Sequence, residues 1–144
     1  MVVDLEIEVT FQSDKLLLSG TLIVPENDIP PPCVILIHGS GAQDRDGNIS
    51  GFNTQIFKYI AEDLAQRGIA SFRYDKRGCG QSEGNFKIAG LSEMVDDACA
   101  AVDFKNNQIS QIDPNKIYVH GHSEGAVLAP EIAARRKQLA GIVM

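Results

Sequence analysis

The apolar run Cys33–Ile37 constrains the fold of this chain more than any other stretch of its sequence. A strand built from such a run has no polar face, so it must be buried on both sides, as the central strands of parallel sheets are. A glycine-rich loop follows from His38 to Gly47, and apolar spacing then predicts a helix over residues 53–66. The succession of buried strand, loop and helix indicates an α/β fold with a mostly parallel sheet.

The same succession occurs again further along the chain, and an alternating N-terminal hairpin precedes it. Residues 3–11 alternate apolar and polar side chains, which predicts a half-buried strand that pairs with a second strand at 15–24. Further strands are expected at 33–37, 69–74, 116–120 and 139–144, with helices at 53–66, 91–106 and 126–137. The prediction is one domain, residues 1–144, with about six strands and with helices on both faces of the sheet.

Composition and charge exclude several classes of partner. The formal net charge is −6, and the one short basic patch, Arg135 to Lys137, falls in the last turn of an expected helix. Neither nucleic acid nor a membrane surface is therefore expected as a partner. Three widely spaced cysteines without a C-x-x-C pair favour a reducing compartment over a disulfide framework or a zinc site. The start shows no signal-peptide pattern and no run is long enough to span a bilayer, so we expect a cytoplasmic protein.

The stretch Gly121-His-Ser-Glu-Gly125 has the pattern G-x-S-x-G and lies between an expected strand and an expected helix. A strand that turns sharply into a helix exposes the central side chain, and flanking glycines remove the Cβ atoms that would otherwise clash. Ser123 would then lie at the positive end of the helix, where a hydroxyl can attack a carbonyl carbon. The alternative is a turn of small residues in which the serine is incidental.

Three motifs follow three expected strands in one order: His38-Gly-Ser-Gly41, Asp75-Lys-Arg-Gly-Cys-Gly-Gln-Ser82 and Gly121-His-Ser-Glu-Gly125. Together they resemble the α/β-hydrolase superfamily, in its small esterase and serine-aminopeptidase-like branch, over essentially the whole chain. The resemblance implies a serine hydrolase of carboxylesterase type, which cleaves an ester, thioester or amide through an acyl-enzyme. It also implies a truncated α/β-hydrolase fold that holds the N-terminal part of the domain.

The resemblance assigns roles to site residues. Ser123 is the expected nucleophile, and the backbone N–H groups of Glu124 and Ser40 are the expected oxyanion hole. Two such donors, preorganised near the nucleophile, would stabilise the tetrahedral oxyanion. His38 is expected to orient its loop, and His122 is expected to pack against neighbours rather than act as a base.

Members of this family place an acid and then a histidine after the nucleophile, and this sequence departs from that order. No histidine or aspartate follows Ser123, and Glu131 is expected to point away along its helix. Three interpretations stay open: the chain is the N-terminal part of a hydrolase, a second chain supplies the acid and base, or the protein is a non-catalytic binding or structural module. Little or no steady-state esterase activity is expected from the chain alone.

No cofactor or metal is expected. Neither glycine-rich loop matches a nucleotide-binding pattern. The run Asp44–Ile49 resembles the middle of a calcium-binding EF-hand loop, but Ala42 and Asn53 occupy the positions of its two end ligands. Asp75 and Arg77 are expected to pair with each other and hold their loop.

The expected partners are a small-molecule, ester-like substrate and further copies of the chain. An apolar strand at 139–144 would leave an open edge, which invites pairing with another chain. We therefore expect a homo-oligomer joined at that strand or over a bare face of the sheet.

Overall fold

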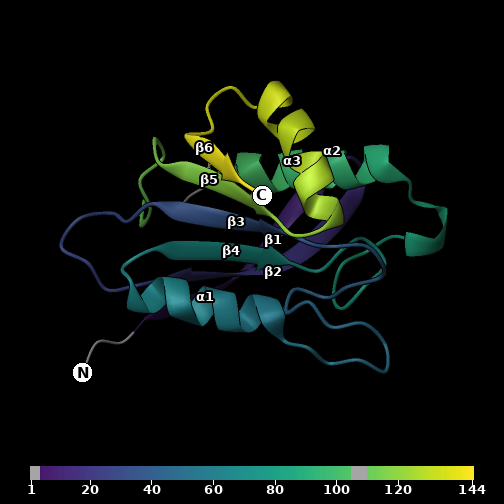
Figure 1. Ribbon diagram of the computed structural model, residues 1–144, viewed down its shortest axis with the longest axis horizontal. Helices are drawn as coiled ribbons and strands as arrows, with labels where there is room; N and C mark the ends of the chain where they lie inside the picture. The colour runs from purple at the N-terminus through teal and green to yellow at the C-terminus, as the bar shows by residue number, and fades with distance from the viewer. Residues whose placement is uncertain (1–3, 105–109) are drawn as a thin grey trace.

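The computed structural model describes residues 4–104 and 110–144, and its strands form one sheet in the order β1-β2-β4-β3-β5-β6 (Figure 1). The strands are β1 (Leu5–Ser13), β2 (Leu16–Val24), β3 (Cys33–Ile37), β4 (Ala70–Tyr74), β5 (Ile117–Gly121) and β6 (Gly141–Val143). The helices are α1 (Ile56–Gln66), α2 (Leu91–Asp103) and α3 (Glu124–Arg135), with a short 3₁₀ turn at Phe86–Ile88. Neighbours among β3, β4, β5 and β6 pair in parallel. The predicted α/β architecture with a mostly parallel, six-stranded sheet is confirmed.

The N-terminal hairpin is joined to the parallel strands by a close backbone contact. β1 and β2 pair as predicted, around a turn in which Asp14 has a φ of 51°. β2 then pairs antiparallel with β4. A Cβ at Gly20 would lie 2.6 Å from the carbonyl oxygen of Arg73 and 2.8 Å from the ring of Phe72. Only glycine fits there, so the hairpin can lie directly against β4, the strand that precedes the motif from Asp75 to Ser82.

Helix α1 begins at Ile56 rather than at the expected residue 53. The preceding residue, Gln55, has a φ of 52°, a left-handed conformation that a right-handed helix does not contain. The Gln55 N–H donates to Oδ1 of Asn48 at 2.9 Å, so the segment is bound to the loop before it instead of extending the helix. A contact between residues of the same loop therefore sets the start of α1.

The last strand, β6, is shorter than the expected range 139–144 and pairs in parallel with β5. Within residues 4–104 and 110–144 it lies at the edge of the sheet. Association of two chains through this strand stays a prediction. The expected helix 91–106 corresponds to α2, and residues 105 and 106 lie outside the described residues.

Helices cover both faces of the sheet, as predicted. Figure 1 shows α1 on one face and both α2 and α3 on the other. α1 packs on β4 and β2, whereas α3 packs on β5, β6 and β3. None of the helices among the described residues is long and apolar enough to cross a membrane.

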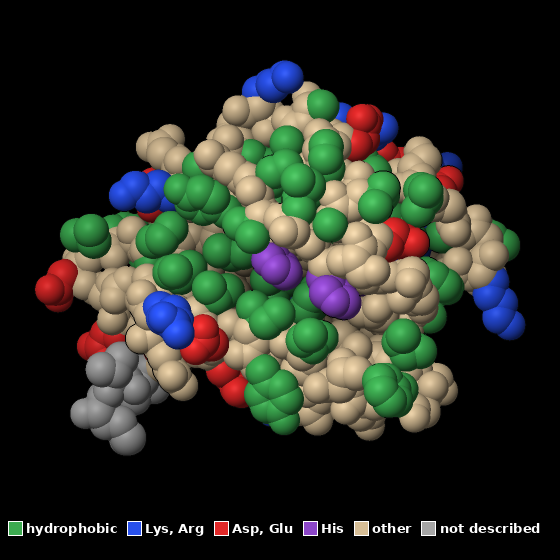
Figure 2. Space-filling view, viewed as in Figure 1, with side chains coloured by type: hydrophobic (Ala, Val, Ile, Leu, Met, Phe, Trp, Pro, Cys, Tyr) green, Lys and Arg blue, Asp and Glu red, His purple; other side chains and the backbone are tan. Residues whose placement is uncertain are grey.

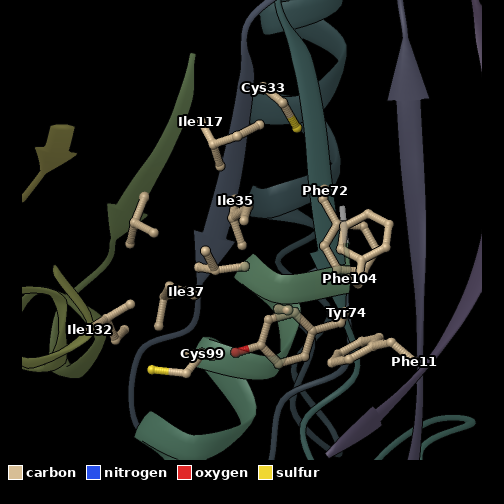
Figure 3. Close-up of a cluster of buried hydrophobic side chains, with 14 of the residues drawn as sticks. Phe11, Cys33, Ile35, Ile37, Phe72, Tyr74, Cys99, Phe104, Ile117 and Ile132 are labelled. Atoms are coloured by element: carbon tan, nitrogen blue, oxygen red, sulfur yellow. The ribbon is translucent and has the colours of Figure 1, made fainter. Parts of the chain in front are cut away.

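The main hydrophobic core contains an aromatic cluster that joins the hairpin, β4 and the end of α2 (Figure 3). The ring of Phe72 is fully buried, with its centroid 4.2 Å from that of Phe104 and 5.6 Å from that of Phe11. Phe11 also meets Tyr74 edge to face at 5.6 Å. These contacts hold β4 against the hairpin, and so fix the place of the loop that follows β4.

Replacing Phe72 by alanine should lower the free energy of unfolding by about 3–5 kcal/mol, because the lost ring leaves a cavity in the core. Urea denaturation followed by circular dichroism measures the change. The matched control is Phe52→Ala: the Phe52 side chain is 69% exposed, and its loss should change the free energy of unfolding by less than about 0.5 kcal/mol. Equal losses in the two variants would contradict this description of the core.

Candidate active site

Ser123 lies in a strained turn between β5 and α3. Its backbone has a φ of 55° and a ψ of −114°, outside the regions that non-glycine residues favour, and such a conformation costs about 1–3 kcal/mol. The side chain is exposed, as the sequence predicts for the central residue of a sharp strand-to-helix turn. The turn is held by the His122 N–H, which donates to the Ile37 carbonyl at 3.1 Å, and by the Ala126 N–H, which donates to the Ser123 carbonyl at 2.9 Å.

The two glycines of this turn allow backbone segments to touch. A Cβ at Gly121 would lie 2.3 Å from the carbonyl oxygen of Gly125. A Cβ at Gly125 would lie 2.4 Å from the carbonyl oxygen of Ile37 and 2.8 Å from that of His38. The first turn of α3 therefore packs directly on the end of β3, and the predicted reason for both glycines is confirmed.

The loop after β3 lies beside the turn that carries Ser123. β3 and β5 are parallel neighbours, and Ile37 is paired with Gly121 at their carboxyl ends. A Cβ at Gly39 would lie 3.0 Å from Nδ1 of His122, so the two segments are in contact. Ser40, the next residue of the loop, is exposed. The structure thus brings the segments of Ser40, Ser123 and Glu124 together at one end of the sheet.

The backbone N–H of Glu124 is available because Glu124 is the first residue of α3. The first N–H groups of an α-helix have no partner within the helix, and they carry its partial positive charge. The Glu124 side chain leans toward the loop after β4, with Oε1 at 3.8 Å from Nζ of Lys76. Glu124 therefore presents, beside Ser123, an N–H that has no partner inside α3, and it places a carboxylate beside a buried cation.

Lys76 is a site residue that the sequence analysis missed. It is only 4% exposed, and its Nζ donates to the carbonyl oxygens of Gly39 at 2.6 Å and Gly41 at 2.9 Å. Burial lowers the pKa of Lys76, although the nearby carboxylate of Glu124 acts in the opposite direction. No local pattern marks this contact, since it forms only because β4 and β3 are neighbours in the sheet.

The expected ion pair between Asp75 and Arg77 is wrong. Asp75 instead pairs with Arg45, whose Nη2 is 2.8 Å from Oδ2, and it also accepts the N–H groups of Arg45 and Gln81. Arg77 reaches Asp97 on α2, with Nη2 at 2.6 Å from Oδ1. The two side chains follow the same strand but face different elements, so they cannot meet. The expected capping of the loop by Asp75 is present.

The positive charge of Arg45 affects the protonation of Asp75. Burial by itself would raise the pKa of Asp75, but the Arg45 guanidinium and the backbone donors hold that pKa below its usual value. The Arg45 guanidinium also contacts Glu8, with Nη1 at 2.6 Å from Oε2. Asp75 therefore stays ionised and fixes the loop, and no hydrogen bond joins it to Ser123 in the described residues.

His38 is buried beneath its loop and is neutral. It is 1% exposed, and its ring packs edge to face on Tyr74 at 5.1 Å and against Phe57 at 5.4 Å. Burial, together with the charge of Lys76, lowers the pKa of His38 to about 3. A group that does not accept a proton near neutral pH and lies in the core cannot serve as a general base. This agrees with the expected structural role.

The other two histidines lie near the turn without contacting the Ser123 hydroxyl. Figure 2 shows histidine side chains on one face of the molecule, bordered by hydrophobic side chains. His122 is exposed, and its ring meets Phe57 edge to face at 6.2 Å, which agrees with the expected packing role. His120 is half-buried in β5. Among residues 4–104 and 110–144, no hydrogen bond joins Ser123 to a histidine, and Glu131 binds Arg135 along α3 instead.

In the EF-hand-like run Asp44–Ile49, the carboxylates of Asp44 and Asp46 bind other groups of the protein. Oδ1 of Asp44 accepts the N–H groups of Asp46 and Asn48 at 2.9 and 3.0 Å, which closes the loop on itself. Asp46 pairs with Arg73, with Nε at 2.9 Å from Oδ1. No group of three or more histidine, cysteine, aspartate or glutamate side chains in the described part of the chain could hold a metal ion.

Comparison with known proteins finds relatives of the same architecture. Residues 48–144 match the family model described as "Serine aminopeptidase, S33". The chain is 39% identical over 127 residues to esterase EstD of Thermotoga maritima, and this match covers 88% of the chain and 29% of EstD. The crystal structure of the α/β hydrolase GrgF from Penicillium sp. sh18 gives a TM-score of 0.76 at 25% identity, covering 97% of the chain and 44% of GrgF.

A further solved structure is Est1E of Butyrivibrio proteoclasticus with ferulic acid bound. Its TM-score is 0.72 at 25% identity, and the match covers 93% of this chain and 50% of Est1E. The chain therefore spans less than a third of EstD and no more than half of GrgF or Est1E.

Replacing Gly125 by alanine should lower the free energy of unfolding by about 3 kcal/mol, because the new methyl group would overlap backbone atoms that cannot move aside. Gly90→Ala is the control: the nearest atom to a Cβ there is the flexible end of Glu93, at 3.1 Å, and a loss below about 1 kcal/mol is expected. Thermal or urea unfolding of both variants measures the difference. Near-native stability of the Gly125 variant would contradict the close packing of α3 on β3.

Buried, neutral His38 should make the fold sensitive to mild acid. An unfolded histidine binds a proton below about pH 6.5, whereas folded His38 does not until the pH approaches 3. The unfolded state thus binds more protons in this window, so the contribution of His38 is complete above about pH 6.5 and is lost as the pH falls. The free energy of unfolding should fall between about pH 6.5 and 5, above the usual range of carboxyl groups. His38→Phe, which keeps a ring in place, should make that slope shallower; an unchanged slope would contradict a neutral His38.

Proposed function

The chain belongs to the serine aminopeptidase S33 family of α/β-hydrolases, and on this premise we propose that it carries the nucleophile and oxyanion hole of a serine hydrolase of carboxylesterase type. The observation that carries the proposal is the strained backbone and exposed side chain of Ser123 at the N-terminus of α3. Such a conformation persists only where the surrounding structure enforces it, and it presents the hydroxyl to a substrate. In the proposed reaction the substrate is an ester, thioester or amide.

The proposed chemistry is acyl transfer through Ser123. Its Oγ attacks the carbonyl carbon of the substrate, and the carbonyl oxygen becomes an oxyanion. The N–H groups of Glu124 and Ser40 donate to that oxyanion, and each such donor contributes about 3–4 kcal/mol to the stability of the transition state. The tetrahedral intermediate then expels the leaving group as it takes up a proton, and water later hydrolyses the acyl-enzyme.

The reaction also needs a group that accepts the Ser123 proton, and we propose that this base is not among the described histidines. His38 is buried and neutral, and His120 and His122 make no hydrogen bond to Ser123. The histidine and its orienting acid would then be supplied by polypeptide outside these 144 residues, in the same protein or in a second chain. Removing the base from a serine protease lowers kcat by about 10⁶, so the chain alone should turn over esters very slowly.

The relatives support an ester rather than another substrate. EstD is named an esterase, and Est1E was solved with ferulic acid, an aromatic carboxylic acid. Hydrophobic side chains border the histidines in Figure 2, which suits an apolar acyl group. We therefore propose a carboxylic ester with an apolar acyl part as the substrate of the complete site.

The proposal predicts that an added base will reveal the nucleophile. Alone, the wild-type chain should hydrolyse p-nitrophenyl acetate at the rate of the Ser123→Ala variant. With imidazole in solution, the wild-type rate should exceed that of Ser123→Ala, because imidazole can accept the Oγ proton. A fluorophosphonate probe should label Ser123 under the same conditions, as read by mass spectrometry of the digested protein.

The control is Ser92→Ala, which removes an exposed serine of α2 and should leave the imidazole-dependent rate unchanged. Rapid turnover without imidazole, lost in Ser123→Ala, would show that the chain already contains its base. Absence of labelling at Ser123 and of any imidazole effect would favour a non-catalytic module of the same fold.

A further inference from the structure

We infer that Lys76 is a positioning residue that orients the Ser40 N–H for oxyanion binding by holding the carbonyl groups of Gly39 and Gly41. This inference rests on the proposed function, in which the Ser40 N–H is one of two oxyanion donors. Two hydrogen bonds support this inference: Nζ of Lys76 donates to the carbonyl oxygen of Gly39 at 2.6 Å and to that of Gly41 at 2.9 Å. We call this arrangement the lysine latch.

The latch works through the geometry of the peptide bond. The Gly39 carbonyl and the Ser40 N–H belong to one planar peptide unit, and no peptide bond in the described residues is cis. In a trans unit the C=O and the N–H point in opposite directions. Because the Gly39 oxygen points inward to buried Lys76, the Ser40 N–H must point outward, to the side on which Ser40 and Ser123 are both exposed.

Further hydrogen bonds prevent the loop from turning over. The Ser40 carbonyl accepts from Nε2 of Gln43 at 2.7 Å, and the Gln43 carbonyl accepts from the Lys76 N–H at 3.2 Å. Gln43 is itself buried. A flip of the Gly39–Ser40 peptide would therefore break the shorter of the two charge-assisted hydrogen bonds of a buried ammonium, which would keep only the one to the Gly41 carbonyl. Glycine at 39 and 41 would otherwise permit such a flip, since glycine restricts the backbone least.

Lys76 also connects the two proposed oxyanion donors. Its Nζ is 3.8 Å from Oε1 of Glu124, whose N–H is the second donor, and it lies 5.5 Å from the centroid of the Phe86 ring. The positive charge polarises the Gly39–Ser40 peptide, and a polarised peptide has a stronger N–H donor. Lys76 thus acts on the Ser40 donor through the Gly39–Ser40 peptide and contacts the side chain of the residue that carries the second donor.

Nuclear magnetic resonance tests the latch directly, first in the wild-type chain and then in a variant that lacks the ammonium group. A through-hydrogen-bond coupling should join Nζ of Lys76 to the carbonyl carbons of Gly39 and Gly41. In Lys76→Met these two carbonyl signals and the amide signal of Ser40 should move, while signals of the β1–β2 hairpin stay in place. Absence of the coupling in the wild-type chain would overturn the latch.

Kinetics of fluorophosphonate labelling, with imidazole present, test its effect on the site. Lys76→Met should lower the maximal labelling rate of Ser123 at least about tenfold, compared with about 10²–10³ for outright removal of an oxyanion donor. The half-saturating probe concentration should not change, because Lys76 does not contact the probe. Lys116→Met, which alters an exposed lysine near Asp113, is the matched control and should label like the wild type.

Lys76→Arg keeps a cation with several donors, so it should label faster than Lys76→Met; it also serves as the second variant if the methionine variant does not fold. A maximal rate in Lys76→Met equal to that of the wild type would overturn the positioning role. Failure of the wild-type chain to label Ser123 would overturn the proposed function, and with it this role. The coupling measurement separates the two failures, because it detects the latch whether or not Ser123 reacts.

Discussion

The parallel pairing of β3 with β5 is the constraint on which the candidate site depends. In their register Ile37 stands opposite Gly121, so the loop after β3 and the turn after β5 begin at the same level of the sheet. α3 then returns so closely over β3 that only glycine fits at position 125. Backbone atoms in direct contact set the separation of the two segments, and such contacts leave much less freedom than long side chains would.

Charged side chains from the segment after β4 also fix the position of the elements around the site. Three successive residues after β4 each bind a different neighbour: Asp75 binds Arg45, Lys76 binds the loop after β3, and Arg77 binds Asp97 on α2. Ion pairs of this kind add little net stability, because desolvation offsets their attraction. Loss of either partner, however, leaves an uncompensated charge inside the protein. One short segment therefore fixes the position of several elements around the site.

The sequence predicts features that depend on nearby residues and misses those that depend on strand order. The apolar run at 33–37 and the glycines at 121 and 125 have local causes, and the structure confirms both. The partners of Lys76 and Arg77 could not be predicted, because the bonded groups are 37 and 20 residues away along the chain. The expected Asp75–Arg77 pair fails for the same reason: proximity in sequence is no guide once each side chain faces a different element.

The left-handed backbone at Ser123 has a consequence for how this fold would change under selection. Glycine adopts that conformation without strain, so a glycine at position 123 would give a more stable protein than serine does. Stability alone therefore disfavours the residue that is present. Variants selected only for heat resistance should drift away from serine here, and they would lose the hydroxyl while keeping every other contact of the turn.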